Sequence, residues 1–132
     1  MRPYTEWIAR AKSALALSRV EVVEGMFYED VCAQAQQAAE KALKALSIFH
    51  GVEPEYTHNI RNIITELRKL TEVDSFIDEA TKLTKYAYIT RYPGDFVDVP
   101  YDEYTKAIEI ATRTVEWVEI KIFEATLKNQ NN

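Results

Sequence analysis

The chain has 132 residues, the length of one domain, and we expect a single helical domain over residues 1–132 with its core at about 4–128. Hydrophobic residues make up 47% of the chain, with only three glycines and four prolines, which excludes a disordered chain and favours long helices. The formal charge of −5 includes no basic stripe, which argues against a non-specific nucleic-acid binder and against RNA as a partner.

Five amphipathic segments are predicted in chain order, and no strand. The first runs from about Tyr4 to Glu24, and Gly25 is its natural stop. The second runs from about Asp30 to His50, with an apolar stripe built largely of alanine, and Gly51 stands where a left-handed residue commonly closes a helix. Because alanines let another helix approach closely, this segment is predicted to be either the central helix of a bundle or a subunit interface.

The next two segments are shorter. Thr57 resembles an N-cap for a helix that ends at about Leu70. Asp74 or Ser75 can cap a fourth helix, which ends near Arg91 because the following Pro93 disfavours helical backbone at the residue before it.

The fifth segment opens at Tyr101 or Asp102, and the polar tail LKNQNN is predicted to fray. Short connections between long helices favour antiparallel neighbours. The fold class predicted is therefore all-α, an up-and-down antiparallel bundle of four to five helices.

The cysteine content and hydropathy indicate the setting. The single Cys32 excludes an internal disulfide and is most simply a small core residue. No cysteine and histidine cluster has zinc-ligand spacing, so we expect no metal and no cofactor. No apolar run approaches the ~20 residues that cross a bilayer, and the amino terminus resembles no signal peptide, so we expect no membrane association and a cytoplasmic location.

Catalytic motifs are absent from the sequence, including the nucleophile elbow, the zinc-protease helix and glycine-rich phosphate loops. The two histidines, His50 and His58, flank one loop, and a structural role is favoured for both because no acid-base partner is identifiable. Gln34, Gln37 and Lys41 form a polar strip beside the alanine face, which either contacts water or hydrogen-bonds a ligand.

The stretch TKYAYITRYPGDF, at the end of the fourth predicted helix, is the strongest candidate site. At ~100° per residue Arg91 flanks the apolar stripe, with Tyr88 and Tyr92 beside it and Lys85 one turn earlier. Two phenols and two cations can stack a base and pair with phosphate. The alternative is that Arg91 pairs with Asp95 or another acid and only fixes how the chain leaves the helix.

Three blocks, YEDVCAQAQQAAEKALKALSIFHG, THNI and YAYITRYPGDF before a last amphipathic helix, together resemble the HEPN (higher eukaryotes and prokaryotes nucleotide-binding) family. The resemblance spans about Trp7 to Trp117 and implies a helical bundle that commonly forms a homodimer. Small members of this type are often paired with a minimal nucleotidyltransferase in toxin-antitoxin-like modules. Other members are ribonucleases with an R-x4-6-H motif from each subunit at a shared cleft.

That motif is missing here, because positions 96–98, where a histidine would follow Arg91, hold none. We therefore expect no catalytic residue, and a non-catalytic domain that dimerises, binds a nucleotidyltransferase and can hold a nucleotide. The expected ligand-binding residues are Arg91, Tyr92, Tyr88, Lys85, Lys41 and Gln37. Two alternatives remain: a ribonuclease toxin that pairs Arg91 with Tyr92 or Asp95 as base, and a structural adaptor whose alanine face is its interface.

Overall fold

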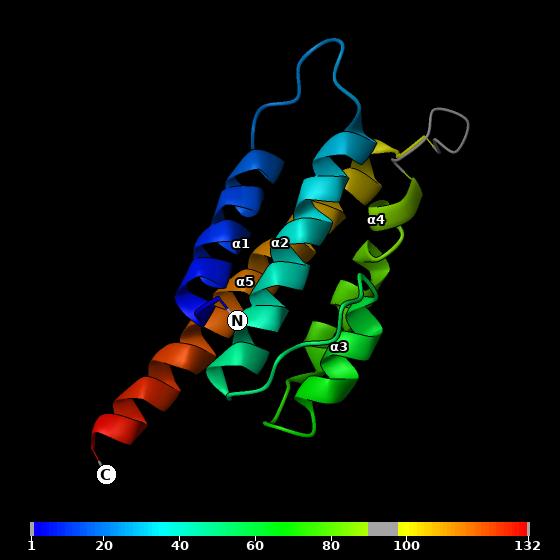
Figure 1. The fold of residues 1–132 in the computed structure, drawn as a ribbon. Coiled ribbons are helices and arrows are strands. Elements are labelled where there is room, and N and C mark those ends of the chain that lie inside the picture. Colours follow the sequence, from blue (N-terminus) through cyan, green and yellow to red (C-terminus); the bar gives the residue numbers. More distant parts are fainter. Residues whose placement is uncertain (1, 90–97, 132) are drawn as a thin grey trace.

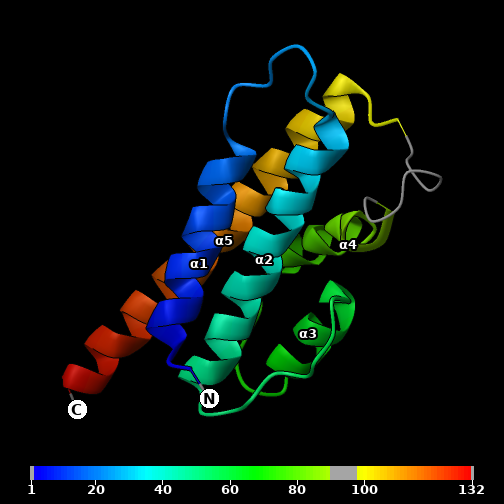
Figure 2. The ribbon, with the colours of Figure 1, turned by 45° about the horizontal axis from the view of Figure 1, so that its top comes forward.

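The computed structural model describes residues 2–89 and 98–131, which form helices joined by loops and contain no strand. The elements are α1 (Tyr4–Ser18), α2 (Tyr28–Phe49), α3 (Ile60–Leu67), the 3₁₀ helix η1 (Ser75–Leu83), α4 (Tyr86–Ile89) and α5 (Tyr101–Gln130). Helices α1, α2 and α5 lie side by side, with α1 antiparallel to the other two, and the shorter elements flank α2 on its other side (Figures 1 and 2). The predicted all-α bundle is confirmed.

Helix α2 is the centre of this bundle and contacts every other helical element. Its alanines at 35, 38, 39, 42 and 45 are fully buried within the chain, and so is Cys32. Small side chains allow the neighbouring helices to approach α2 closely on several sides. Of the two roles predicted for the alanine face, the structure therefore selects the central helix and leaves that face unavailable as a subunit interface.

Helix α1 is shorter than predicted, because it ends at Ser18 and not at Glu24. The Ser18 hydroxyl donates a hydrogen bond to the Leu15 carbonyl and so competes with continuation of the helix. Three valines follow within the next five residues, and β-branched residues are weak helix formers. Helix α2, in contrast, closes as predicted, since Gly51 has a φ of 79°.

Helix α3 begins later than predicted. Its N-cap is Asn59 and not Thr57, because the Asn59 side chain accepts a hydrogen bond from the Asn62 amide at 3.4 Å. The Thr57 hydroxyl instead accepts from the Asn59 amide at 3.0 Å, before the helix begins. Sequence position alone did not show which of two nearby cap-forming residues has its side chain at the helix start.

The fourth predicted helix is divided into two pieces. Residues 75–83 form the 3₁₀ helix η1, and the α-helical part is only the short α4. A 3₁₀ helix turns by about 120° per residue, so side chains projected at ~100° per residue rotate away from their expected faces. The last helix is longer than predicted, since α5 stays helical to Gln130, within the tail that was predicted to fray.

Candidate functional site

The predicted site lies partly within the described structure. Arg91, Tyr92 and Asp95 lie outside the described residues, whereas Lys85 and Tyr88 are described. The Lys85 ammonium pairs with Glu103 on α5, with a distance of 2.6 Å between Nζ and Oε1. The Tyr88 ring is exposed and makes an edge contact with His58, at 6.3 Å between ring centroids. The break between η1 and α4 thus leaves these two side chains with different neighbours.

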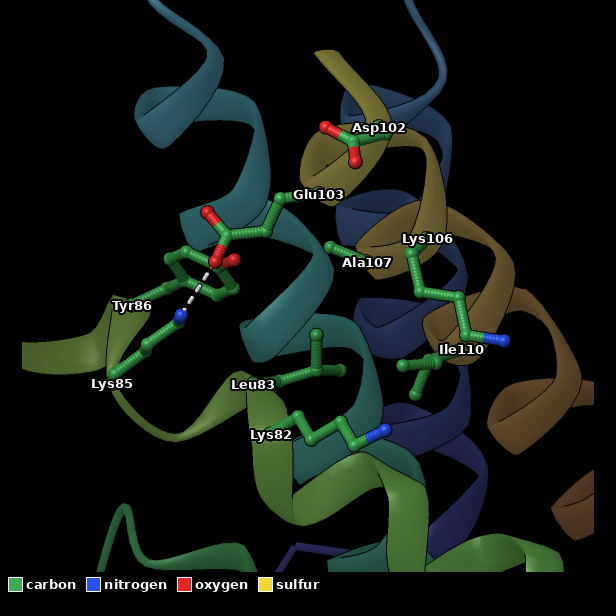
Figure 3. A pocket seen from close by; sticks show the side chains of 9 residues that line it. All are labelled: Lys82, Leu83, Lys85, Tyr86, Asp102, Glu103, Lys106, Ala107 and Ile110. Carbon is green, nitrogen blue, oxygen red and sulfur yellow. Dashed lines mark hydrogen bonds and ion pairs between the residues drawn. The ribbon is translucent and has the colours of Figure 1, made fainter. Parts of the chain in front are cut away.

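Lys85 belongs to a hollow of about 460 Å³ between the η1–α4 segment and α5 (Figure 3). Lys82, Lys85 and Lys106 line it from its two sides, and Leu83, Ala107 and Ile110 form its apolar part. This volume is within the range of small-ligand sites.

Three lysines and two acids, Asp102 and Glu103, line this hollow, so its formal charge is only slightly positive. Lys106 lies 3.8 Å from Glu79 and 3.9 Å from Glu109, which are long ion-pair distances. Lys82 forms no ion pair among residues 2–89 and 98–131. Two cations with weak or no partners can therefore contact a phosphate or carboxylate group, while Lys85 is already neutralised by Glu103.

The wall of the hollow nearest α2 carries Tyr86, which is 2% exposed. Burial raises the pKa of Tyr86 well above its usual value, and the neighbouring Cys32 and Glu103 raise it further. Burial likewise raises the pKa of the Cys32 thiol to about 11. Both groups are protonated at neutral pH, so Cys32 is the inert core residue that the sequence predicts and not a nucleophile.

The two other predicted ligand residues lie elsewhere. Lys41 lines a groove between α1 and α2 with Glu6, Trp7 and Arg10. The buried indole N–H of Trp7 has no acceptor within the described part of the chain. Gln37 donates from Nε2 to the Gln36 side chain at 2.7 Å. The six predicted residues are thus not gathered into one described pocket, because Lys41 borders α1 whereas Lys85 borders α5.

A buried polar network on α2 was not predicted. Glu40 Oε1 accepts from Gln36 Nε2 at 2.8 Å, and Oε2 pairs with Lys44 Nζ at 3.0 Å. His58 Nδ1 lies 2.9 Å from Glu40 Oε1. The side chains of Glu40 and Lys44 are only 5% and 7% exposed. The sequence did carry a signal for this network. Gln36, Glu40 and Lys44 are spaced by four, which places them on one line along a helix whose other buried positions are mostly alanine.

This network gives His58 the oriented acceptor that the sequence did not identify. Glu40 lies on α2, before the loop that leads to His58, and its carboxylate approaches the His58 ring only in the folded chain. A carboxylate beside one ring nitrogen fixes the tautomer and orientation of an imidazole, and the His58 side chain is 35% exposed. His50, in contrast, is the exposed C-cap residue of α2, as its predicted structural role requires.

The described residues form neither a metal centre nor a membrane-spanning helix. They contain no group of three or more histidine, cysteine, aspartate or glutamate side chains placed to hold a metal ion. None of the described helices is both long enough and apolar enough to span a membrane.

Comparison with known proteins gives consistent matches. The HEPN domain family model matches residues 4–121. TT1696 from Thermus thermophilus is 30% identical with a TM-score of 0.78, and the archaeal HEPN homologue ST0689 is 32% identical with a TM-score of 0.69. Each crystal structure match covers 92% of this chain and 99% of the other. No curated protein matches. A family model that spans nearly the whole bundle, together with these two structures, shows that the chain belongs to the HEPN domain family.

Proposed function

We propose that this protein is a non-catalytic HEPN-type domain that forms a homodimer and binds a nucleotidyltransferase in a toxin-antitoxin-like module. The observation that carries the proposal is HEPN membership over residues 4–121 in a sequence without R-x4-6-H. Without this motif the ribonuclease members' arginine and histidine pair cannot form at a dimer cleft. A binding role, in a cytoplasmic complex, is then the simplest use of the shared bundle architecture.

The proposal includes a nucleotide at the end of the bundle where α4 leads into residues 90–97. Lys82 and Lys106 offer cations to phosphate at the hollow of Figure 3, and Lys85 becomes available if Glu103 releases it. Arg91 and Tyr92 follow α4 closely in the sequence, so we expect them to add a guanidinium group and an aromatic ring.

Calorimetry with ATP and GTP tests the nucleotide part. The wild-type protein should bind one of them, and Lys82→Met and Arg91→Ala should each weaken binding by about tenfold, as loss of one charge-assisted hydrogen bond predicts. Lys69→Met is the matched control, because Lys69 is an exposed lysine that pairs only with Glu66 among the described residues. Absence of heat with both nucleotides would remove this part and leave the partner part standing.

The partner part is tested first by whether a nucleotidyltransferase gene adjoins this one, and then with the protein that such a gene encodes. Co-expression of the two proteins, with an affinity tag on the enzyme alone, should yield a complex of defined stoichiometry in size-exclusion chromatography. Two separate peaks at micromolar concentration would contradict the partnership, whatever the calorimetry shows.

A ribonuclease activity is the second candidate, and one observation favours it. His58 is held by Glu40 and touches the ring of Tyr88, three residues before Arg91 in the sequence. His58 is then a further candidate base beside Tyr92 and Asp95. This alternative predicts that purified protein cleaves RNA and that His58→Gln and Arg91→Ala abolish cleavage. RNA that stays intact after long incubation excludes it.

A further inference from the structure

A groove lies along the face that α1 and α2 share, and its lining has no residue in common with the hollow of Figure 3. Its first part, of about 310 Å³, is lined by Arg2, Glu6, Trp7, Arg10 and Lys41. Glu6, Arg10 and Lys41 also line a second part of about 330 Å³, so the two parts adjoin. We call them together the α1–α2 groove. Its size is within the range of small-ligand sites.

The charged groups of the α1–α2 groove do not balance. Three cations, Arg2, Arg10 and Lys41, lie beside one acid, Glu6, and the other lining residues carry no charge. Glu6 Oε1 lies 2.6 Å from Arg2 Nη1 and 3.6 Å from Arg10 Nη2, so the only carboxylate of the groove is already shared. Lys41 forms no ion pair within residues 2–89 and 98–131. The groove is therefore cationic, with one ammonium group left for an anion.

Lys41 is half-buried on the central helix, and its own helix offers it no acid. The positions three and four residues before and after it are held by Ala38, Gln37, Lys44 and Ala45. These are the positions from which a side chain reaches its neighbour on a helix surface. Because a half-buried ammonium has lost part of its hydration, a negative group from outside the chain is a favourable partner for it.

Trp7 adds a hydrogen-bond donor without an acceptor. Its ring lines the first part of the groove, and its Nε1 is buried with no acceptor in the described part of the chain. A buried N–H without a partner is destabilising, and an acceptor on a ligand would remove that cost. The rim can open to admit one, since the side chains of Arg2 and Arg10 are 69% and 64% exposed.

The groove continues into apolar surface in both directions from Lys41 and Trp7. Ala14 and Leu17 of α1 line the second part. On the other side, Ile48 and Pro54 line a further depression of about 190 Å³, which shares Trp7 with the first part. A ligand with a charged head at Lys41 would therefore place an apolar body against the Trp7 ring and one of these two sides.

We propose that the α1–α2 groove binds a small apolar monocarboxylate, an aliphatic or aromatic acid. Its two carboxylate oxygens accept from Lys41 Nζ and Trp7 Nε1, and its apolar body lies along the groove. This site goes beyond the proposed function, because it involves neither the nucleotide site nor the partner protein. A nucleoside triphosphate does not fit it, since several negative charges need more cations than the groove leaves unpaired.

Nuclear magnetic resonance of the indole N–H groups tests the proposal. The chain has two tryptophans, so Trp7→Phe assigns both signals. Titration with phenylacetate should move the Trp7 N–H signal downfield and saturate at about millimolar concentration, while the Trp117 signal stays in place. Phenylacetamide has the same shape without the charge, and it should bind at least tenfold more weakly.

Variants at Lys41 separate a specific site from general attraction to a cationic face. Lys41→Met should raise the dissociation constant of phenylacetate about tenfold, and Lys41→Arg should keep most of the affinity. Lys69→Met is the matched control, because Lys69 is an exposed lysine that lines no part of the groove. Lys82→Met, which removes a cation of the proposed nucleotide site, should also leave phenylacetate binding unchanged. Far-UV circular dichroism verifies that the variants stay folded.

Three results would overturn the carboxylate site. The first is a Trp7 signal that phenylacetate does not move, and the second is equal binding of phenylacetate by wild type and Lys41→Met. The third is phenyl phosphate that binds at least tenfold more tightly than phenylacetate, which would assign the groove to phosphate esters. None of them bears on the nucleotide calorimetry, in which Lys82 and Arg91 are the residues varied.

Discussion

The Glu40 network allows a sharp prediction of stability. Glu40→Leu removes the carboxylate that accepts from Gln36 Nε2 and Lys44 Nζ and contacts His58 Nδ1, while Lys44 stays 6% exposed. Breaking a buried ion pair from one side leaves an uncompensated charge, which costs about 3–5 kcal/mol. For a chain of this length that is a fall in Tm of roughly 10–20 °C. Urea unfolding followed by circular dichroism measures the loss directly.

The double variant separates the charge effect from loss of packing. Lys44→Met removes the unpaired ammonium, so Glu40→Leu with Lys44→Met should be more stable than Glu40→Leu alone by about 1–3 kcal/mol. Glu66 and Lys69 form the matched control, with the same 3.0 Å distance in an exposed pair. Glu66→Leu should change the free energy of unfolding by less than about 1 kcal/mol. A loss below about 1 kcal/mol for Glu40→Leu, or strict additivity in the double variant, would refute this account.

Three further predictions concern the core, the pH and a cap. Because burial raises the pKa of Cys32 to about 11 and also raises that of Tyr86, the unfolded chain loses these protons first, so the free energy of unfolding should fall as pH rises from about 9 to 11 in urea titrations. Ala42→Leu should destabilise by about 1–3 kcal/mol through overpacking, measured by thermal unfolding, and an unchanged Tm would contradict a tight core at α2. Asn59→Ala should cost about 0.5–1 kcal/mol, more than Thr57→Ala in the same assay, and the reverse order would indicate that Thr57 is the cap.

Several features of the fold could be predicted from the sequence because they depend on local spacing. The apolar steps of α2 gave its bounds to within two residues, and Gly51 closes it with positive φ as expected. The lack of strands in the described ranges and the buried position of Cys32 followed from composition. Family resemblance to HEPN proteins, carried by blocks along the whole chain, is confirmed by the match over residues 4–121.

Other features could not be predicted, because they depend on weak local effects or on which elements meet in space. The early end of α1 follows from a side-chain hydrogen bond at Ser18 and a short run of valines, two weak local effects that the apolar pattern did not reveal. Lys85 lies in the turn after the 3₁₀ helix η1 and pairs with Glu103 on α5, whereas Tyr88 in α4 contacts His58. A projection at one fixed angle per residue could not separate these two side chains.

The sequence by itself determined the helical class, the alanine-rich apolar stripe of the second helix and the absence of R-x4-6-H, because each depends on residue type and spacing along one chain. Tertiary structure alone decided that Glu40 meets His58 across a loop, that Lys41 and Lys85 border different helices, and that α5 presents Phe123 to solvent. The physical reason is that helical periodicity states which residues share a face, whereas only the packing of the helices determines what that face contacts.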